Sequence, residues 1–251
     1  MVAVHYVSVL PAPELIYPVI LLASVIQSLF GVGVLLLGTP WMLLLGMNFP
    51  ATLQLLLPIS LTISLLQLSR GHQYVDRVLL RGITMLTLPA IVVALLASTL
   101  WSPPLEIFVA ILVLTFSLQD RVRLIRHGLN QLLGFQRTYI AIMGFVHGVS
   151  NLGGSMLTAL AFGKGLHRDV SRATIAAGYT LFAIVQLTTL RLAGTTWQID
   201  LGTGAGLIVT GATTFWLTER YIFSRFDSRR YRIGLEALLI ITGSLLLLSA
   251  F

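Results

Sequence analysis

The chain contains no cysteine and few charged residues. Only 10% of its 251 residues are charged, against about 25% in ordinary soluble domains. The absence of cysteine excludes disulfides, thiolate metal sites and a cysteine nucleophile. What the chain has instead is apolar sequence, since 56% of its residues are hydrophobic, in runs longer than the ~10-residue strands of an outer-membrane barrel. We therefore expect an all-α integral membrane protein.

Carboxylates are also absent from the middle of every apolar run. All nine acidic residues fall in loops or near a segment end, whereas cation and proton transporters commonly carry a carboxylate at mid-membrane. A cationic substrate and a carboxylate proton relay are therefore disfavoured. The net charge of +7 is interpreted as orientation and headgroup contact, so we expect the lipid bilayer as a partner and no nucleic acid.

Eight apolar segments are separated by one long polar insert. The segments cover about 16–46, 51–69, 82–101, 105–119, 138–163, 172–191, 201–218 and 233–251. We expect a single membrane domain over 1–251, with a first repeat at 16–119, a cytoplasmic linker at 120–137 and a second repeat at 138–251. An offset of 122 residues places Ala51-Thr52 on Ala173-Thr174, which favours an internal repeat.

The basic residues predict the topology. If all eight segments crossed the membrane, the 16 basic residues would divide evenly between its two sides, against the positive-inside rule. If the fifth segment enters and returns on one side, only Arg191 remains outside. We therefore expect each half to contain one re-entrant, broken-helix hairpin and three transmembrane helices. Such an arrangement is that of an inverted-repeat transporter. We expect it in the cytoplasmic (inner) membrane of a prokaryote, with its Arg-rich loops in the cytoplasm.

Each hairpin is predicted to break at a glycine-rich motif. Non-helical backbone at membrane depth must be buried in protein or line a wet cavity, and helix amino termini favour anions. Small residues also serve close helix packing, which is the alternative interpretation of any single glycine. The paired breaks predict a small-anion site formed by Ser28, Gly31 and Gly33 in the first motif and by Ser150, Asn151, Gly153, Gly154 and Ser155 in the second.

Four further polar residues within the segments are candidates. Gln54, Tyr179 and Gln186 are predicted to line the substrate path. His147 lies four residues before Asn151 and either couples protons near neutral pH or is a neutral core residue. No HExxH pair or metal-ligand cluster is present, so we expect no metal and no cofactor. The oligomeric state stays open, with a homo-oligomer among the alternatives.

At these motifs the sequence resembles the sulfite exporter TauE/SafE family of membrane anion transporters, known as TSUP. Gly31-Val32-Gly33 is followed by Pro40, nine residues after the first glycine. The second motif is similar to that of the family's second repeat. The chain departs from the family in both motifs: Val34 and Leu35 stand where the family extends the first glycine run, and Phe162 replaces the proline of the second repeat. The resemblance rests on Gly144, Gly148, Ser150, Asn151, Gly153 and Gly154. It implies export of sulfite, thiosulfate or organosulfonates from the cytoplasm.

Competing functions use the same residues. A transporter would expose the site to each side in turn by alternating access, whereas an anion channel would lack only a gate. An intramembrane serine hydrolase would pair His147 with Ser150, and it needs hydrogen-bond contact between base and nucleophile together with an oxyanion hole. Asn151 follows Ser150 where such an enzyme is expected to have glycine, so we expect a transporter and not an enzyme.

Overall fold

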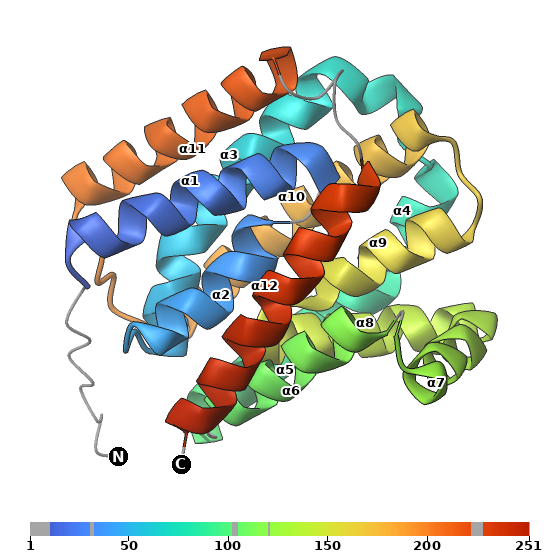
Figure 1. Cartoon of the computed structure of the whole chain (residues 1–251), viewed down its shortest axis with the longest axis horizontal. Coiled ribbons are helices and arrows are strands. Elements are labelled where there is room, and N and C mark those ends of the chain that lie inside the picture. Colours follow the sequence, from blue (N-terminus) through green and yellow to red (C-terminus); the bar gives the residue numbers. More distant parts are fainter. Residues whose placement is uncertain (1–10, 31–32, 102–104, 120, 222–227, 251) are drawn as a thin grey trace.

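The computed structural model of the chain describes residues 11–30, 33–101, 105–119, 121–221 and 228–250, and within these ranges it is helical and contains no strand (Figure 1). Gly31 of the first motif lies outside the described residues. Three described helices are long and apolar enough to cross a membrane, at Phe49–Tyr74, Arg77–Leu100 and Arg168–Leu192. Shorter apolar helices lie at Pro13–Leu29, Val34–Leu44, Leu105–Leu118, Gly153–Gly163 and Leu235–Ser249.

The first half begins with a helical hairpin. Its arms pack against each other, so the chain reverses where the glycine motif predicted a break. Asn48 starts the next helix because its side chain accepts a hydrogen bond from the amide of Ala51 at 2.8 Å, a typical amino-terminal cap. The helices are α1 (Pro13–Phe30), α2 (Val34–Leu44), α3 (Phe49–Gly71), η1 (His72–Tyr74), α4 (Arg77–Gly82), the π-helical turn η2 (Ile83–Thr87), α5 (Leu88–Trp101) and α6 (Leu105–Leu118).

The second half contains a matching hairpin. Its first arm ends because Asn151 adopts the left-handed conformation, with φ 64°, which asparagine tolerates better than most residues. The second arm starts at Gly153 and packs against the first. The helices are α8 (Gln136–Ser150), α9 (Gly153–Gly163), α10 (Arg168–Leu192), α11 (Leu201–Tyr221) and α12 (Ser228–Ser249).

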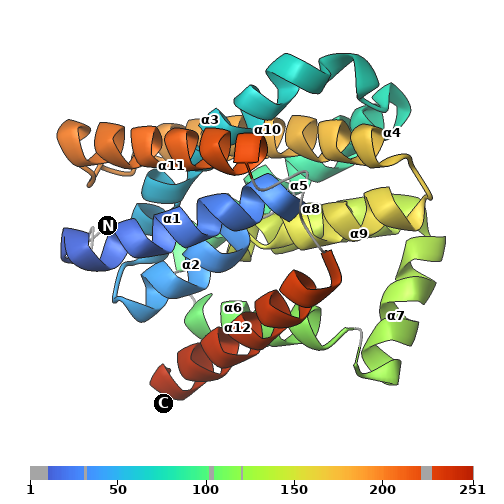
Figure 2. The same ribbon diagram turned by 45° about the horizontal axis from the view of Figure 1, so that its top comes forward.

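The linker between the halves contains a helix that the sequence did not predict, α7 (Arg123–Gly134). It is amphipathic: Leu132 and Leu133 pack against the core, whereas Arg123, Arg126 and Gln131 are exposed. Figure 2 shows α7 at one end of the bundle, lying across the ends of α8 and α9. The predicted polar joint is therefore partly a structured surface helix.

The centre of the bundle is the pair α3 and α10, which pack along each other. In the most apolar stretch of each helix, 67% of the α3 segment and 72% of α10 are buried. The corresponding value is 33% for the helix formed by α4, η2 and α5. Around this pair, α1 lies beside α11 and α5 beside α8 (Figures 1 and 2). Helix α12 packs on α6 and α2. The two hairpins are thus enclosed by the other helices.

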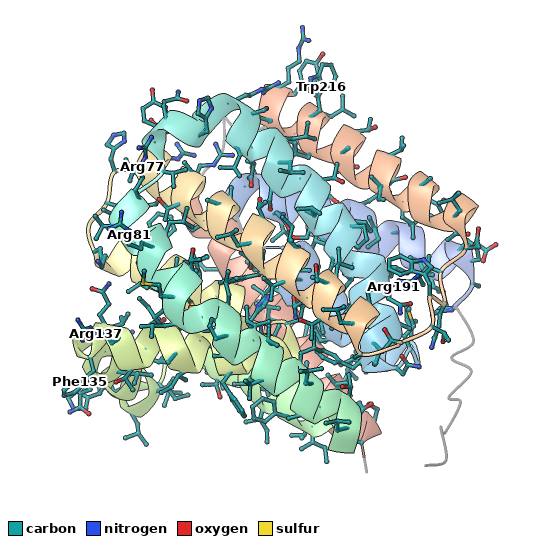
Figure 3. All side chains as sticks on the ribbon, turned by 180° about the vertical axis from the view of Figure 1, so that it is seen from behind. Arg77, Arg81, Phe135, Arg137, Arg191 and Trp216 are labelled. Carbon is teal, nitrogen blue, oxygen red and sulfur yellow. The ribbon has the colours of Figure 1, made fainter. Side chains whose placement is uncertain are left out.

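Four arginines mark the two ends of the bundle. Figure 3 shows Arg77, Arg81 and Arg137 at one end of the long helices and Arg191 at the other. This is the grouping expected from the charge pattern of the sequence.

Candidate functional site

Asn151 lies fully buried at the second break and connects the two hairpins. Its Nδ2 donates a hydrogen bond to Oγ1 of Thr39 on α2 at 3.0 Å. Its Oδ1 has no hydrogen-bonding partner among the described residues. Such buried unpaired atoms are few in native proteins, so the unpaired Oδ1 marks the break as a candidate ligand site.

The two serines beside Asn151 differ in their hydrogen bonding. Ser150 Oγ donates to the carbonyl of Val146 at 2.6 Å and accepts from the amide of Leu152 at 3.2 Å. A catalytic serine–histidine pair would require a hydrogen bond between Ser150 and His147. The hydroxyl of Ser150 instead bonds to backbone groups. Ser155 Oγ, by contrast, is buried and has no partner in the described part of the chain. Ser155 is therefore the serine available to a ligand.

Three more predicted residues gather against the second hairpin. The ring of His147 lies 4.6 Å from that of Phe182 and 6.4 Å from that of Tyr179, between centroids. Gln186 Nε2 donates to the backbone carbonyl of His147 at 3.4 Å. Both ring nitrogens of His147 and Oε1 of Gln186 lack hydrogen bonds within the described ranges. Tyr179, Gln186 and His147 thus lie close together beside the second break.

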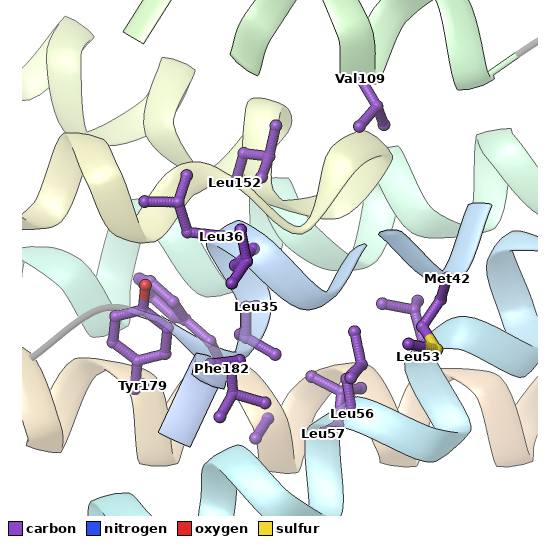
Figure 4. Close-up of a cluster of buried hydrophobic side chains, with 14 of the residues drawn as sticks. Leu35, Leu36, Met42, Leu53, Leu56, Leu57, Val109, Leu152, Tyr179 and Phe182 are labelled. Atoms are coloured by element: carbon purple, nitrogen blue, oxygen red, sulfur yellow. The ribbon is translucent and has the colours of Figure 1, made fainter. Parts of the chain in front are cut away.

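The glycines of the second break are needed for close packing. A Cβ atom on Gly153 would lie 2.5 Å from Cβ of His147 and 2.6 Å from the carbonyl oxygen of Met143, and one on Gly154 would overlap the hydroxyl of Tyr179. Protein atoms therefore occupy the space that these glycines leave. In Figure 4, Leu152 at the break and Tyr179 belong to one buried apolar cluster with Leu35 of α2.

The first break has the same packing but different hydrogen bonding. A Cβ on Gly33 would overlap the backbone of Ala23 and Gln27. The amide of Val34, the first residue of α2, donates to Oε1 of Gln27 at 3.1 Å, and Gln27 Nε2 reaches Oγ of Ser60 at 3.4 Å. Gln27, which was not among the residues predicted from the sequence, therefore caps α2 from within the hairpin.

Ser28 lies at a second polar contact of the first hairpin. Its Oγ donates to Glu219 on α11 at 3.5 Å, and its carbonyl accepts from Arg172 on α10 at 3.2 Å. Arg172 and Glu219 form an ion pair at 2.9 Å. This network fixes the end of α1 to two other helices. Sequence reasoning missed it because opposite charges on separate helices carry no local signal.

The side chain of Gln54 bonds to a loop rather than to either break. Its Nε2 donates to the carbonyl of Thr196 at 2.9 Å and its Oε1 accepts from the amide of Gln198 at 2.9 Å. Both polar atoms of this side chain are thus bonded to the loop between α10 and α11. These contacts favour a role in holding that loop.

Two cavities lie near the hairpins. One, with a volume of about 130 Å³, is lined by Arg70, Arg172 and Glu219 among others. The other, about 180 Å³, is lined by residues of α6, α7, α8 and α9, including Ser155. No group of three or more His, Asp or Glu residues that could hold a metal ion occurs within the described ranges.

A family model described as sulfite exporter TauE/SafE matches residues 16–246, which is nearly the whole chain. No curated protein and no solved structure matches the chain.

Proposed function

The chain belongs to the sulfite exporter TauE/SafE family, and on that premise we propose that it exports small sulfur-containing anions from the cytoplasm. Sulfite, thiosulfate or an organosulfonate is the expected substrate. We assign its binding site to the second break. The observation that carries this assignment is the set of buried polar atoms without partners in Asn151, Ser155 and His147, next to the start of α9.

The chemistry of this break suits an anion. A helix leaves the amides of its first turn without intrahelical acceptors, and these carry partial positive charge. The amide of Ser155 already donates to the carbonyl of Leu152 at 3.1 Å, so we expect Gly153 and Gly154 to supply the amides. The hydroxyl of Ser155 adds a neutral donor.

Asn151 can contribute a further donor. A hydroxyl both donates and accepts, so a half-turn of the Asn151 amide keeps its bond to Thr39 and turns Nδ2 toward the ligand. Which end of an amide faces a hydroxyl is assigned from the hydrogen-bond network rather than observed directly. The proposed site therefore binds an oxyanion without a Lys or Arg at the break.

We also propose that the two halves form an inverted repeat, and the helix packing supports this. The contact of α1 with α11 in one half corresponds to the contact of α8 with α5 in the other. In the same way, the contact of α3 with α11 corresponds to that of α10 with α5. Helices α2 and α9 have 11 residues each and begin at Val34 and Gly153, 119 positions apart. The turns after them carry Gly46 and Gly165, both with positive φ, at the same spacing.

The central pair of helices follows a longer offset. Gly38 of α2 meets Leu56 of α3, and Leu157 of α9 meets Gly178 of α10, so the contact recurs with glycine and leucine exchanged. Leu56 and Gly178 are 122 positions apart, as are the Ala-Thr pairs. The second arms of the hairpins are thus related by an offset of 119 positions and the central helices by one of 122. The difference of three residues corresponds to about one extra helical turn in α10.

In the proposed mechanism, alternating access exposes the site to each side in turn as one repeat moves against the other. His147 is the proposed group for proton coupling, because it lies beside the break and imidazole is the side chain that ordinarily titrates near neutral pH. Saturable, stoichiometric exchange in proteoliposomes would separate this mechanism from an anion channel. Flux without saturation would favour the channel.

The decisive experiment measures thermal stabilisation of the purified protein by sulfite, thiosulfate, sulfate, small sulfonates and carboxylates. A ligand at 100 times its Kd adds about 2.7 kcal/mol to the stability of the bound protein. We expect a selective shift with a sulfur oxyanion that is lost in Asn151→Gly. Glycine tolerates the left-handed conformation, so this variant removes the amide without straining the turn. No shift with any anion would overturn the proposed site.

The proposed orientation puts the Arg-rich end in the cytoplasm. Because the chain has no cysteine, Lys164→Cys and Leu192→Cys would each carry a single thiol. Lys164 lies in the turn between α9 and α10, and Leu192 is the last residue of α10. We expect impermeant thiol reagents to label the first from the cytoplasmic side and the second from outside. The reverse pattern would contradict the orientation.

A further inference from the structure

The cavity of about 180 Å³ follows one face of α9 up to the proposed site. Gly163, Ala159 and Ser155 all line it and are spaced four residues apart, so they lie on the same side of the helix. Eight residues of helix span about 12 Å. The cavity therefore runs from the end of α9 nearest α7 to the first turn of α9, beside Asn151.

The opposite wall of the cavity comes from α7. Arg126 and Asn130 line it, and they are one helical turn apart. Tyr139 of α8 closes one side, with its hydroxyl already donating to the carbonyl of Met156 at 2.8 Å. Arg126 is the charged side chain among the described residues that line the cavity. The lining thus combines the positive charge of Arg126, contributed by α7, with the unpartnered hydroxyl of Ser155, contributed by α9.

The composition of this lining favours a wet space over a packing defect. Cavities that stay empty in proteins are apolar, whereas polar, roomy ones hold water. Here a guanidinium, the Asn130 amide and the Ser155 hydroxyl line the same space as the apolar Phe116 and Met156. Walls of low polarity strengthen the field of a single charge inside a cleft.

We propose that this cavity is the cytoplasmic access route for the transported anion, with α7 as its outer wall, Arg126 as the attracting charge and Ser155 as the donor that passes the anion to the second break. The apolar part of the lining suits an anion that carries a small apolar group, such as an alkyl sulfonate. This inference rests on the proposed function, because the route leads to the proposed site.

The test uses the natural absence of cysteine. Ala159→Cys places one thiol in the cavity wall, and Gly128→Cys places one on α7 where a Cβ meets no atom within 4 Å. Purified protein carrying each thiol is treated with an anionic and a cationic methanethiosulfonate, the sulfonatoethyl and trimethylammonioethyl reagents. The ratio of the two labelling rates at Gly128→Cys corrects for the intrinsic reactivity of the reagents.

We expect Ala159→Cys to favour the anionic reagent by about tenfold over this control, within the range found for charged clefts. Adding Arg126→Gln should remove the preference while Ala159→Cys stays reactive. Monodispersity in size-exclusion chromatography confirms that each variant is folded. An unreactive thiol in a monodisperse protein would overturn the access route, as would equal labelling by the two reagents.

The outcome is separable from that of the proposed function. Labelling requires no transport, so equal labelling in a protein that still shows a selective anion shift overturns the route alone. Transport adds an independent readout: Arg126→Gln should raise the KM for the anion presented on the cytoplasmic side about tenfold and leave kcat nearly unchanged. An unchanged KM would also overturn the role assigned to Arg126.

Discussion

The two helix breaks share their backbone construction but differ in how their polar groups are satisfied. In both, a glycine six residues after a polar side chain packs against the first arm, as Gly33 does on Gln27 and Gly153 on His147. Gln27 caps the next helix through the amide of Val34, whereas the ring nitrogens of His147 bond to no described residue. Among the described residues of the first break, the side chains of Gln27 and Ser28 therefore both have hydrogen-bonding partners.

This difference indicates which of the two breaks needs a ligand to satisfy its polar groups. Leaving a buried polar group unpaired costs roughly 1–3 kcal/mol, so a fold retains several such groups together only where something else satisfies them. The second break concentrates them, in Asn151, Ser155, His147 and Gln186. The first break is instead anchored by the contact of Ser28 with Arg172 and Glu219.

The largest expected effect tests what the breaks share. Gly33→Ala and Gly153→Ala should each cost about 3 kcal/mol, the upper end for overpacking, because the new Cβ meets backbone atoms that cannot move aside. Thermal unfolding in detergent measures this, with Gly128→Ala as the control in open space. Tolerance of either substitution would show that the two breaks are not built alike.

The second prediction separates the breaks. Asn151→Gly should abolish an anion-induced stabilisation of about 2.7 kcal/mol at 100 times Kd. Gln27→Leu should leave that response intact while lowering the stability of the unliganded protein by about 1–3 kcal/mol, because the amide of Val34 loses its acceptor. Thermal shifts with and without the anion measure both. Loss of the anion response in Gln27→Leu would place the first break in the site as well.

The third prediction concerns the anchor of the first hairpin. The side chains of Arg172 and Glu219 are 20% and 19% exposed, so solvent screens the pair only in part, and we expect a coupling of about 1–2 kcal/mol. A double-mutant cycle with Arg172→Gln and Glu219→Gln in thermal unfolding measures it. The anion response should persist in all three variants. If the response is lost, the network contributes to binding as well as to anchoring.

The smallest effect is expected at Gln54. Gln54→Met should lower stability by about 1 kcal/mol, because two hydrogen bonds to the loop at 196–198 are lost. Anion affinity should not change, since both polar atoms of Gln54 are bonded to that loop. A weakened anion response in this variant would return Gln54 to the substrate path.

Much of the fold could be predicted from local sequence. The apolar segments 16–46 and 138–163 are each divided where their glycine motifs indicated, and the others correspond to single long helices or to the helix formed by α4, η2 and α5. Helix α7 was not predicted because it lies in the polar insert between the two halves. Its few leucines are separated by polar and basic residues and do not form a long apolar run. Of the candidate site, Asn151 and its neighbours in the chain were predicted because a break is encoded locally.

The remaining site contacts join residues far apart in the chain. The bond from Asn151 to Thr39 spans 112 positions, and that from Gln54 to Thr196 spans 142. Hydropathy and glycine spacing report on a residue's own helix and not on its partner, so they ranked Gln54 with Tyr179 and Gln186. Only the folded structure distinguishes a side chain that holds a loop from one that lies beside a break.

Apolar length, charge distribution and glycine spacing are local properties, so they were enough to predict a helical membrane protein, the places where its hairpins break and its resemblance to the TauE/SafE family. The tertiary structure decided which polar groups are already paired. That distinction depends on side chains that packing brings together from separate helices, as with Gln27 on Ser60 and Arg172 on Glu219.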